Sequence, residues 1–167
     1  MLRFLDQVNV IVGTLLFLAY LYQVFYTLYG LVFCRRDRRK AARQTPVKPS
    51  RRYAALICAR NEESVIGELI SSLRAQDYPA ELLDIYVLAD NSTDATARVA
   101  RQAGAIAFER FNPYQVGKGY ALNELFSRIR SSRPLSDYDA FLVFDADNIV
   151  DSHFVSAMDR TFAQGYD

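Results

Sequence analysis

Residues 140–147 read AFLVFDAD, an apolar run that ends in two aspartates separated by one residue. A short apolar run bounded by polar residues predicts a buried strand over 140–144. In open α/β sheets, ligands bind just outside the carboxyl ends of the strands. Asp145 and Asp147 would therefore lie at a binding edge, where paired carboxylates suit a divalent cation that carries phosphate groups. A solvated turn is the alternative, because aspartate is also common in turns.

The residues before and after this stretch predict alternating strands and helices. The expected strands are 53–59, 85–89, 105–108 and 140–144, and the expected helices cover 65–73, 95–103, 121–129 and 155–162. Asn61 is expected to cap the first helix and Ser92 or Thr93 the second. Gly104 is expected to end the second helix. Such an alternation predicts an α/β domain with a mainly parallel sheet and helices on both faces.

Right-handed crossovers place the carboxyl ends of all the strands at one edge of a parallel sheet. Three polar clusters follow three of the expected strands, namely Arg60-Asn61-Glu62, Asp90-Asn91-Ser92-Thr93-Asp94 and Asp145-Ala146-Asp147. We therefore expect these clusters to meet and to form one ligand site.

Two common nucleotide-binding motifs are missing. A dinucleotide fold needs G-x-G-x-x-G after its first strand, and no glycine follows Ala59 there. Gly117-Lys118-Gly119 lacks the earlier glycine and the hydroxyl residue of a P-loop. A phosphatase that uses Asp145 as its nucleophile stays open at this point.

Four motifs together resemble the family 2 glycosyltransferases. They are Ala59-Arg60-Asn61-Glu62-Glu63, Asp90-Asn91-Ser92-Thr93-Asp94, Gly117-Lys118-Gly119 with Ala121-Leu122-Asn123, and Asp145-Ala146-Asp147. They occur in the family's order over residues 54–167. The resemblance is strongest to the membrane-anchored branch that includes processive polysaccharide synthases. It implies a partial GT-A (Rossmann-like) domain that binds a nucleotide sugar.

The resemblance also implies a role for each matching residue. Ala59, Arg60 and Glu62 would line the base and ribose pocket, Asp90 would contact uracil or ribose, Lys118 would approach the diphosphate, Asp145 would hold the ribose or the metal, and Asp147 would bind Mg²⁺ or Mn²⁺. The implied donor is a nucleotide-diphospho-sugar, expected to be a UDP-sugar. The implied reaction is hexosyl transfer to a glycan or lipid acceptor.

Residues 8–33 carry no charge and are almost wholly apolar. Because about 20 helical residues cross a bilayer, this run predicts a membrane span. Nine basic residues and one acid lie between positions 34 and 52, so the positive-inside rule predicts a cytoplasmic domain and an external N-terminus at the cell membrane. The expected organisation is a transmembrane helix over 1–34, a basic juxtamembrane linker over 35–52 that favours an anionic lipid bilayer, and the sugar-donor domain over 53–167.

The chain carries no candidate for the catalytic base. In the family, an acceptor-binding half with an acidic base follows the donor half, and Asp151, Asp159 and Asp167 do not resemble that motif. We therefore expect a donor-binding half that is inactive alone. A non-catalytic, membrane-tethered nucleotide-binding remnant or scaffold is the alternative. The net charge of +1 does not favour a nucleic-acid partner, and two cysteines do not suggest a disulfide framework.

Overall fold

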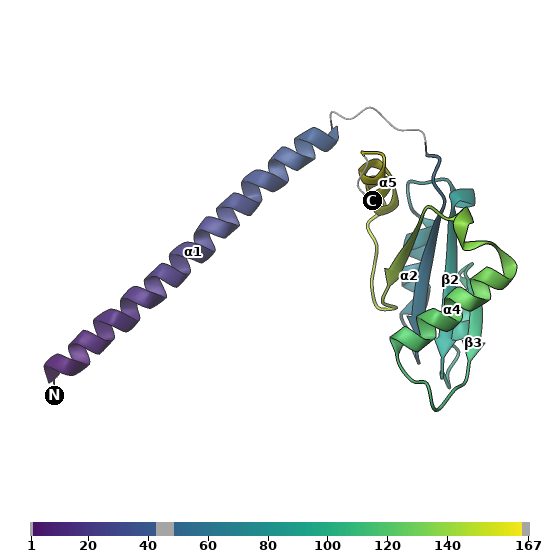
Figure 1. Ribbon diagram of the computed structural model, residues 1–167, viewed down its shortest axis with the longest axis horizontal. Helices are drawn as coiled ribbons and strands as arrows, with labels where there is room; N and C mark the ends of the chain where they lie inside the picture. The colour runs from purple at the N-terminus through teal and green to yellow at the C-terminus, as the bar shows by residue number, and fades with distance from the viewer. Residues whose placement is uncertain (1, 43–48, 165–167) are drawn as a thin grey trace. The chain divides into compact units, whose positions relative to one another are not determined.

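The computed structural model describes residues 2–42 and 49–164, and the chain divides into two compact units, Met1–Pro46 and Val47–Asp167. The first unit is a single helix, α1, over Leu2–Ala42 (Figure 1). Its segment Arg3–Arg36 contains an 18-residue stretch with a mean hydropathy of 1.8, and it is long and apolar enough to cross a membrane. The helix continues through the first basic residues to Ala42. Part of the predicted linker, residues 43–48, lies outside the described residues.

The second unit, here called the sheet domain, alternates strands and helices. Its elements are β1 (Tyr53–Ala59), α2 (Ile66–Arg74), η1 (Ala80–Leu82), β2 (Leu83–Asp90), α3 (Thr96–Gln102), β3 (Ile106–Arg110), α4 (Lys118–Ser132), η2 (Leu135–Asp137), β4 (Ala140–Phe144) and α5 (Phe154–Phe162). The strand order is β3-β2-β1-β4, and every pairing is parallel. This confirms the predicted α/β fold with a parallel sheet.

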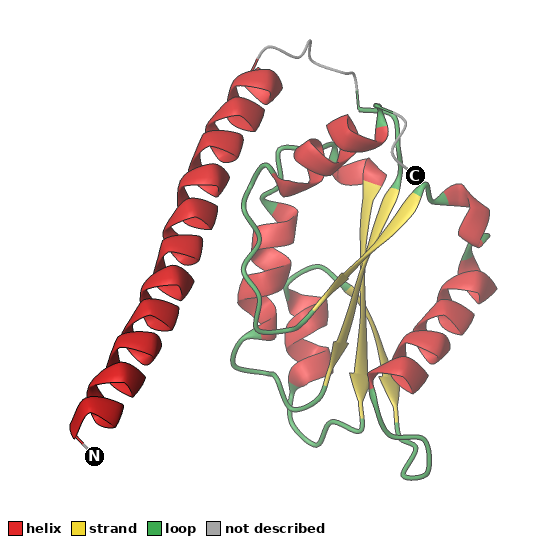
Figure 2. Ribbon diagram, turned by 60° about the vertical axis from the view of Figure 1, so that its left-hand side comes forward, coloured by secondary structure: helices red, strands yellow, loops and turns green. Residues whose placement is uncertain are grey.

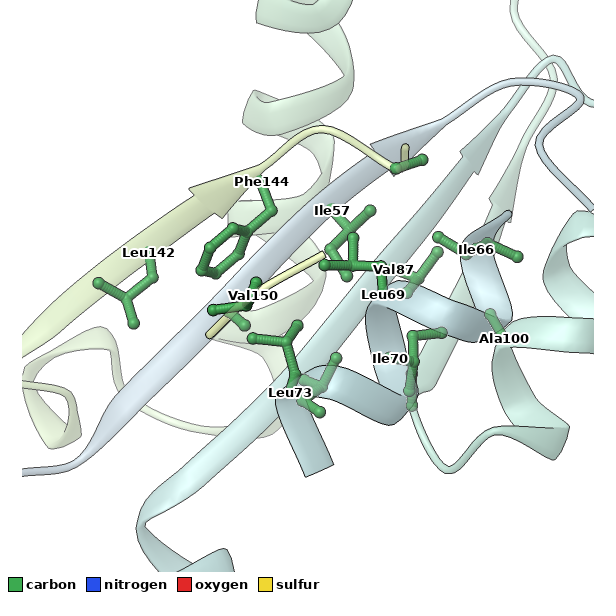
Figure 3. Close-up of a cluster of buried hydrophobic side chains, with 14 of the residues drawn as sticks. Ile57, Ile66, Leu69, Ile70, Leu73, Val87, Ala100, Leu142, Phe144 and Val150 are labelled. Atoms are coloured by element: carbon green, nitrogen blue, oxygen red, sulfur yellow. The ribbon is translucent and has the colours of Figure 1, made fainter. Parts of the chain in front are cut away.

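Helices cover both faces of the sheet (Figure 2). On one face, Ile57 of β1 and Val87 of β2 pack with Leu69 of α2 and Ala100 of α3 (Figure 3). This core also includes Val155 of α5. On the other face, Leu56 packs with Leu125 and other residues of α4. Burial on both faces explains why the central strands read as continuous apolar runs rather than alternating ones.

The predicted caps of the first two helices are wrong. α2 begins at Ile66, and Asn61 lies several residues earlier with a left-handed backbone, φ 55°. The Asn61 amide oxygen accepts a hydrogen bond from the backbone N–H of Thr93 at 2.8 Å, so it holds a neighbouring loop instead of a helix. α3 begins at Thr96, where the carboxylate of Asp94 accepts the backbone N–H at 3.0 Å.

The end of α3 is as predicted. Gly104 has φ 95°, a left-handed conformation that glycine adopts without a Cβ clash. Its N–H bonds to the carbonyl of Arg101, and the N–H of Ala105 bonds to that of Ala100, each at 3.0 Å. The next strand, β3, then runs to Arg110, two residues beyond the predicted end at Phe108. This extension brings an arginine to the carboxyl edge of the sheet.

Candidate functional site

A pocket opens at the carboxyl edge of the sheet, where β1, β2 and the start of α4 meet. It has a volume of about 210 Å³ and is lined by Cys58, Ala59, Arg60, Asp90, Val116, Gly117, Lys118 and Ala121. Ala59, Arg60, Asp90 and Lys118 had all been singled out in the sequence. They come from three separate motifs, which the parallel topology brings to one place.

Lys118 joins this pocket to the aspartate motif. It is the first residue of α4, and its ammonium group forms an ion pair with the carboxylate of Asp145, just after β4. Asp147 is exposed, and its carboxylate accepts no hydrogen bond from the described residues. Glu62 is half-buried and does not line the pocket. Its carbonyl accepts the backbone N–H groups of Val65 and Ile66 at 3.1 and 3.0 Å.

Asp90 is held in the pocket wall by Arg110, a residue that the sequence analysis missed. The two side chains form an ion pair at 2.6 Å, and the residues are 7% and 8% exposed. Arg110 also donates to the carbonyl of Gln115 at 2.9 Å, which ties the loop before α4 to the same carboxylate. The sequence did contain a signal for this residue. Arg110 follows the apolar run 105–108, and a parallel strand there ends at the same edge of the sheet as Asp90.

The loops after β1 and β2 are hydrogen-bonded to each other. The backbone N–H of Asn61 donates to Ser92 Oγ at 3.2 Å, and that of Glu62 donates to Thr96 Oγ1 at 2.9 Å. Asn61 and Asn91 both adopt left-handed backbone, which asparagine tolerates better than most residues. Ser92 of the second motif and Thr96 at the start of α3 therefore shape the pocket rim by fixing the loop that carries Arg60.

Asp94 is a further link between these loops. The hydroxyl of Thr96 at 2.5 Å, together with the backbone N–H groups of Thr96 and Glu63, lowers the pKa of the Asp94 carboxyl. A lowered folded pKa contributes stability above the unfolded value of about 3.9, and this contribution is lost as the pH falls toward the folded pKa. We expect Asp94→Asn to lower the urea midpoint of unfolding at pH 7 and to lower it less at pH 3. A difference that did not depend on pH would contradict this role.

The charges around the pocket suit an anionic ligand. Arg60 is exposed and makes no ion pair within the described residues, and Lys118 also lines the pocket. The charge of Asp90 is offset by Arg110. Burial raises the pKa of the Cys58 thiol to about 11, so this part of the wall is neutral at physiological pH. The pocket is thus lined by two cationic side chains, Arg60 and Lys118, of which Lys118 is paired with Asp145.

A divalent cation fits the aspartate motif only with help from its ligand. Among the described residues, no group of three or more histidine, cysteine, aspartate or glutamate side chains could hold a metal ion. Mg²⁺ commonly needs only one or two protein carboxylates when substrate phosphates and water complete its shell. Asp145 and Asp147 meet that requirement.

The fold and this pocket define an α/β domain of the GT-A type. Residues 49–167 match the family model described as "Glycosyltransferase like family 2", so the chain belongs to glycosyltransferase family 2. This confirms the family resemblance, and it replaces the alternative of a phosphatase at Asp145.

Two curated relatives and one solved structure illustrate the similarity. The 4,4'-diaponeurosporenoate glycosyltransferase of Staphylococcus aureus (strain USA300) is 44% identical over 76 residues, which cover 46% of this chain and 19% of the relative. The beta-monoglucosyldiacylglycerol synthase of Synechocystis is 30% identical over 108 residues, 59% of this chain and 20% of the relative. S. aureus TarS in complex with UDP-GlcNAc has a TM-score of 0.53 at 19% identity, covering 68% of this chain and 31% of that one. The chain thus spans about a fifth of the length of these curated relatives.

Proposed function

We propose that this chain is the donor-binding part of a membrane-anchored glycosyltransferase. It binds a nucleotide-diphospho-sugar, with a UDP-sugar as the expected donor, and presents it for hexosyl transfer to a glycan or lipid acceptor. The observation that carries this proposal is the pocket in which Arg60, Asp90 and Lys118 meet at the carboxyl edge of the sheet. Membership of glycosyltransferase family 2 supports it.

The proposed chemistry explains why cations gather at this edge. When the sugar leaves its donor, negative charge develops on the nucleoside diphosphate. Lys118 would stabilise that charge, since lysine acts as a compact positive charge toward phosphate. Arg60, Asp90 and the backbone at Ala59 would hold the base and ribose, and Glu62 would support the same side of the pocket.

Mg²⁺ or Mn²⁺ is the proposed cofactor, held by Asp147 with Asp145. When bound, such a cation neutralises charge on the diphosphate. Two neighbouring carboxylates would otherwise repel the phosphates. The ion pair between Asp145 and Lys118 supports this proposal, because the proposed metal ligand and the proposed phosphate-binding lysine are in contact.

The length and hydropathy of α1 support anchoring in a bilayer. The basic residues that follow its apolar segment favour a cytoplasmic sheet domain at the cell membrane. One curated relative is named for a glucosylated diacylglycerol, which makes a lipid the first acceptor class to test. A role in polysaccharide synthesis stays a prediction.

Lys118→Met tests the proposed diphosphate contact. Hydrogen bonds to charged groups contribute about 1.5–3 kcal/mol, so we expect UDP to bind the variant about 10–100-fold more weakly. Binding of uridine, which has no phosphate, should be unchanged. Calorimetric titration of the full chain in detergent, with Mn²⁺ present, measures both affinities. UDP is chosen as the probe because TarS was solved with a UDP-sugar.

Arg98→Met is the matched control, because Arg98 is exposed on α3 and does not line the pocket. It should leave both affinities unchanged. If the wild-type chain fails to bind UDP, or if Lys118→Met weakens uridine and UDP equally, the proposed diphosphate site is wrong.

A further inference from the structure

The loop that carries the two aspartates follows an edge strand of the described sheet. β4 pairs with β1 alone among the described strands, and Asp147, Asn148 and Ile149 are all exposed. The backbone N–H of Asn148 donates to the carbonyl of Asp145 at 3.1 Å, which closes one turn. This contact lies within the loop, so the position of Asp147 also depends on how the returning chain is held.

A buried glutamine holds that returning chain. Gln76 follows the end of α2 and is 8% exposed. Its amide nitrogen donates to the carbonyl of Asp151 at 2.8 Å and to that of Ser72 at 3.1 Å. Its amide oxygen accepts the backbone N–H of Val155 at 3.0 Å, near the start of α5. One side chain thus joins α2, the end of the aspartate loop and α5.

Two further contacts follow the same path. Ser72 Oγ accepts the backbone N–H of Val150 at 3.1 Å, and the N–H of Asp77 donates to the carbonyl of Ser152 at 2.7 Å. α2 is itself fixed by the core, because Leu69 and Ile70 are fully buried. The loop is therefore held between β4 on one side and the carboxyl end of α2 on the other.

We propose that Gln76 is a positioning residue for the cation–diphosphate site, acting through the backbone between Val150 and Val155. This inference rests on the proposed function. Gln76 does not touch the ligand in this scheme. It fixes the far end of the loop, so that Asp147 is held near Asp145 before a cation arrives. Substitution of a residue that orients metal ligands without binding the metal commonly lowers metal affinity by about 10–100-fold.

Gln76→Met keeps the approximate size of the side chain and removes its three hydrogen bonds. We expect the Mn²⁺ concentration for half-maximal enhancement of UDP binding to rise about 10–100-fold. UDP binding in EDTA should not change, because the base, ribose and Lys118 contacts remain. A general loss of folding would instead reduce binding under both conditions. Gln102→Met is the matched control, since Gln102 ends α3, is exposed and makes no side-chain hydrogen bond within the described residues.

Ser72→Ala provides a second variant, which removes the contact to Val150 together with the bond that Ser72 Oγ donates to the carbonyl of Leu69 at 2.7 Å within α2. This variant should also raise the Mn²⁺ concentration for half-maximal enhancement of UDP binding, by a smaller factor. The proposal can therefore be tested even if Gln76→Met does not fold. Without any ligand, hydrogen–deuterium exchange in the peptide covering 145–152 should be faster in both variants than in the wild type.

The outcomes separate the two proposals. If the wild-type chain binds no UDP in Mn²⁺, the proposed function fails and the cation role of Gln76 fails with it. If the wild type binds UDP with Mn²⁺ while both variants keep the wild-type Mn²⁺ requirement and exchange rates, only the inference about Gln76 is overturned.

Discussion

Arg110→Met is expected to lower the free energy of unfolding of the sheet domain by about 3–5 kcal/mol. The substitution leaves the carboxylate of Asp90 in a site where the residue is 7% exposed, without the guanidinium that faces it at 2.6 Å. A buried charge that loses its partner keeps its desolvation penalty and loses the compensating attraction. The substitution also removes the hydrogen bond that Arg110 donates to the carbonyl of Gln115, in the loop before α4.

Urea unfolding of the full chain measures this effect, with labelling of Cys58 as the probe in a Cys34→Ser background. The double variant Asp90→Asn with Arg110→Met should regain much of the stability, because it removes the uncompensated charge. Arg101→Met is the control on the neighbouring element. Its ion pair with Glu109 also has a short distance, 2.8 Å, but the side chains are 49% and 46% exposed. Such a pair contributes at most about 1 kcal/mol. Equal losses from the two arginines would refute the argument.

Asp147→Ala is expected to remove the Mn²⁺-dependent part of UDP binding, a loss of about 100-fold or more, since it deletes a proposed metal ligand rather than a residue that only orients one. Asp147 is exposed and accepts no hydrogen bond within the described residues, so its truncation should change stability by less than about 0.5 kcal/mol. Asp145 is less suitable for this test because its substitution also releases Lys118.

Calorimetric titration of UDP with Mn²⁺ and with EDTA measures the effect on the full chain. Glu81→Ala is the matched control, because Glu81 is an exposed acid in η1, just before the amino end of β2 and therefore at the opposite edge of the sheet. Its affinity for UDP should equal that of the wild type under both conditions. An Asp147→Ala chain that still required Mn²⁺ would place the cation elsewhere.

The strands could be predicted because their signal is local. β1 and β4 have the bounds expected from their apolar runs, and burial on both faces explains why those runs are uninterrupted. The caps could not be predicted in the same way. Asn61 and Ser92 are residues that often cap helices, but here they join two loops 31 positions apart in the chain. The local sequence pattern is the same whether such a side chain bonds to its own helix or to a distant loop.

The candidate site likewise contains residues that the local sequence predicts and residues that it does not. Ala59, Arg60, Asp90 and Lys118 were found because each lies in a motif at a strand end or helix start. Arg110 acts on a residue 20 positions away, and Gln76 on residues 75 and 79 positions away. Neither belongs to a polar cluster in the sequence. Their roles follow from which elements pack together, which the periodicity of one segment does not specify.

The left-handed backbone at Asn61 and Asn91 limits which residues near the pocket can be randomised to alter donor preference. Most other side chains would cost about 1–2 kcal/mol in this conformation, so randomising the two positions would destabilise many clones. A productive library would retain both asparagines and vary Arg60 and Val116, which line the same pocket and whose side chains are exposed.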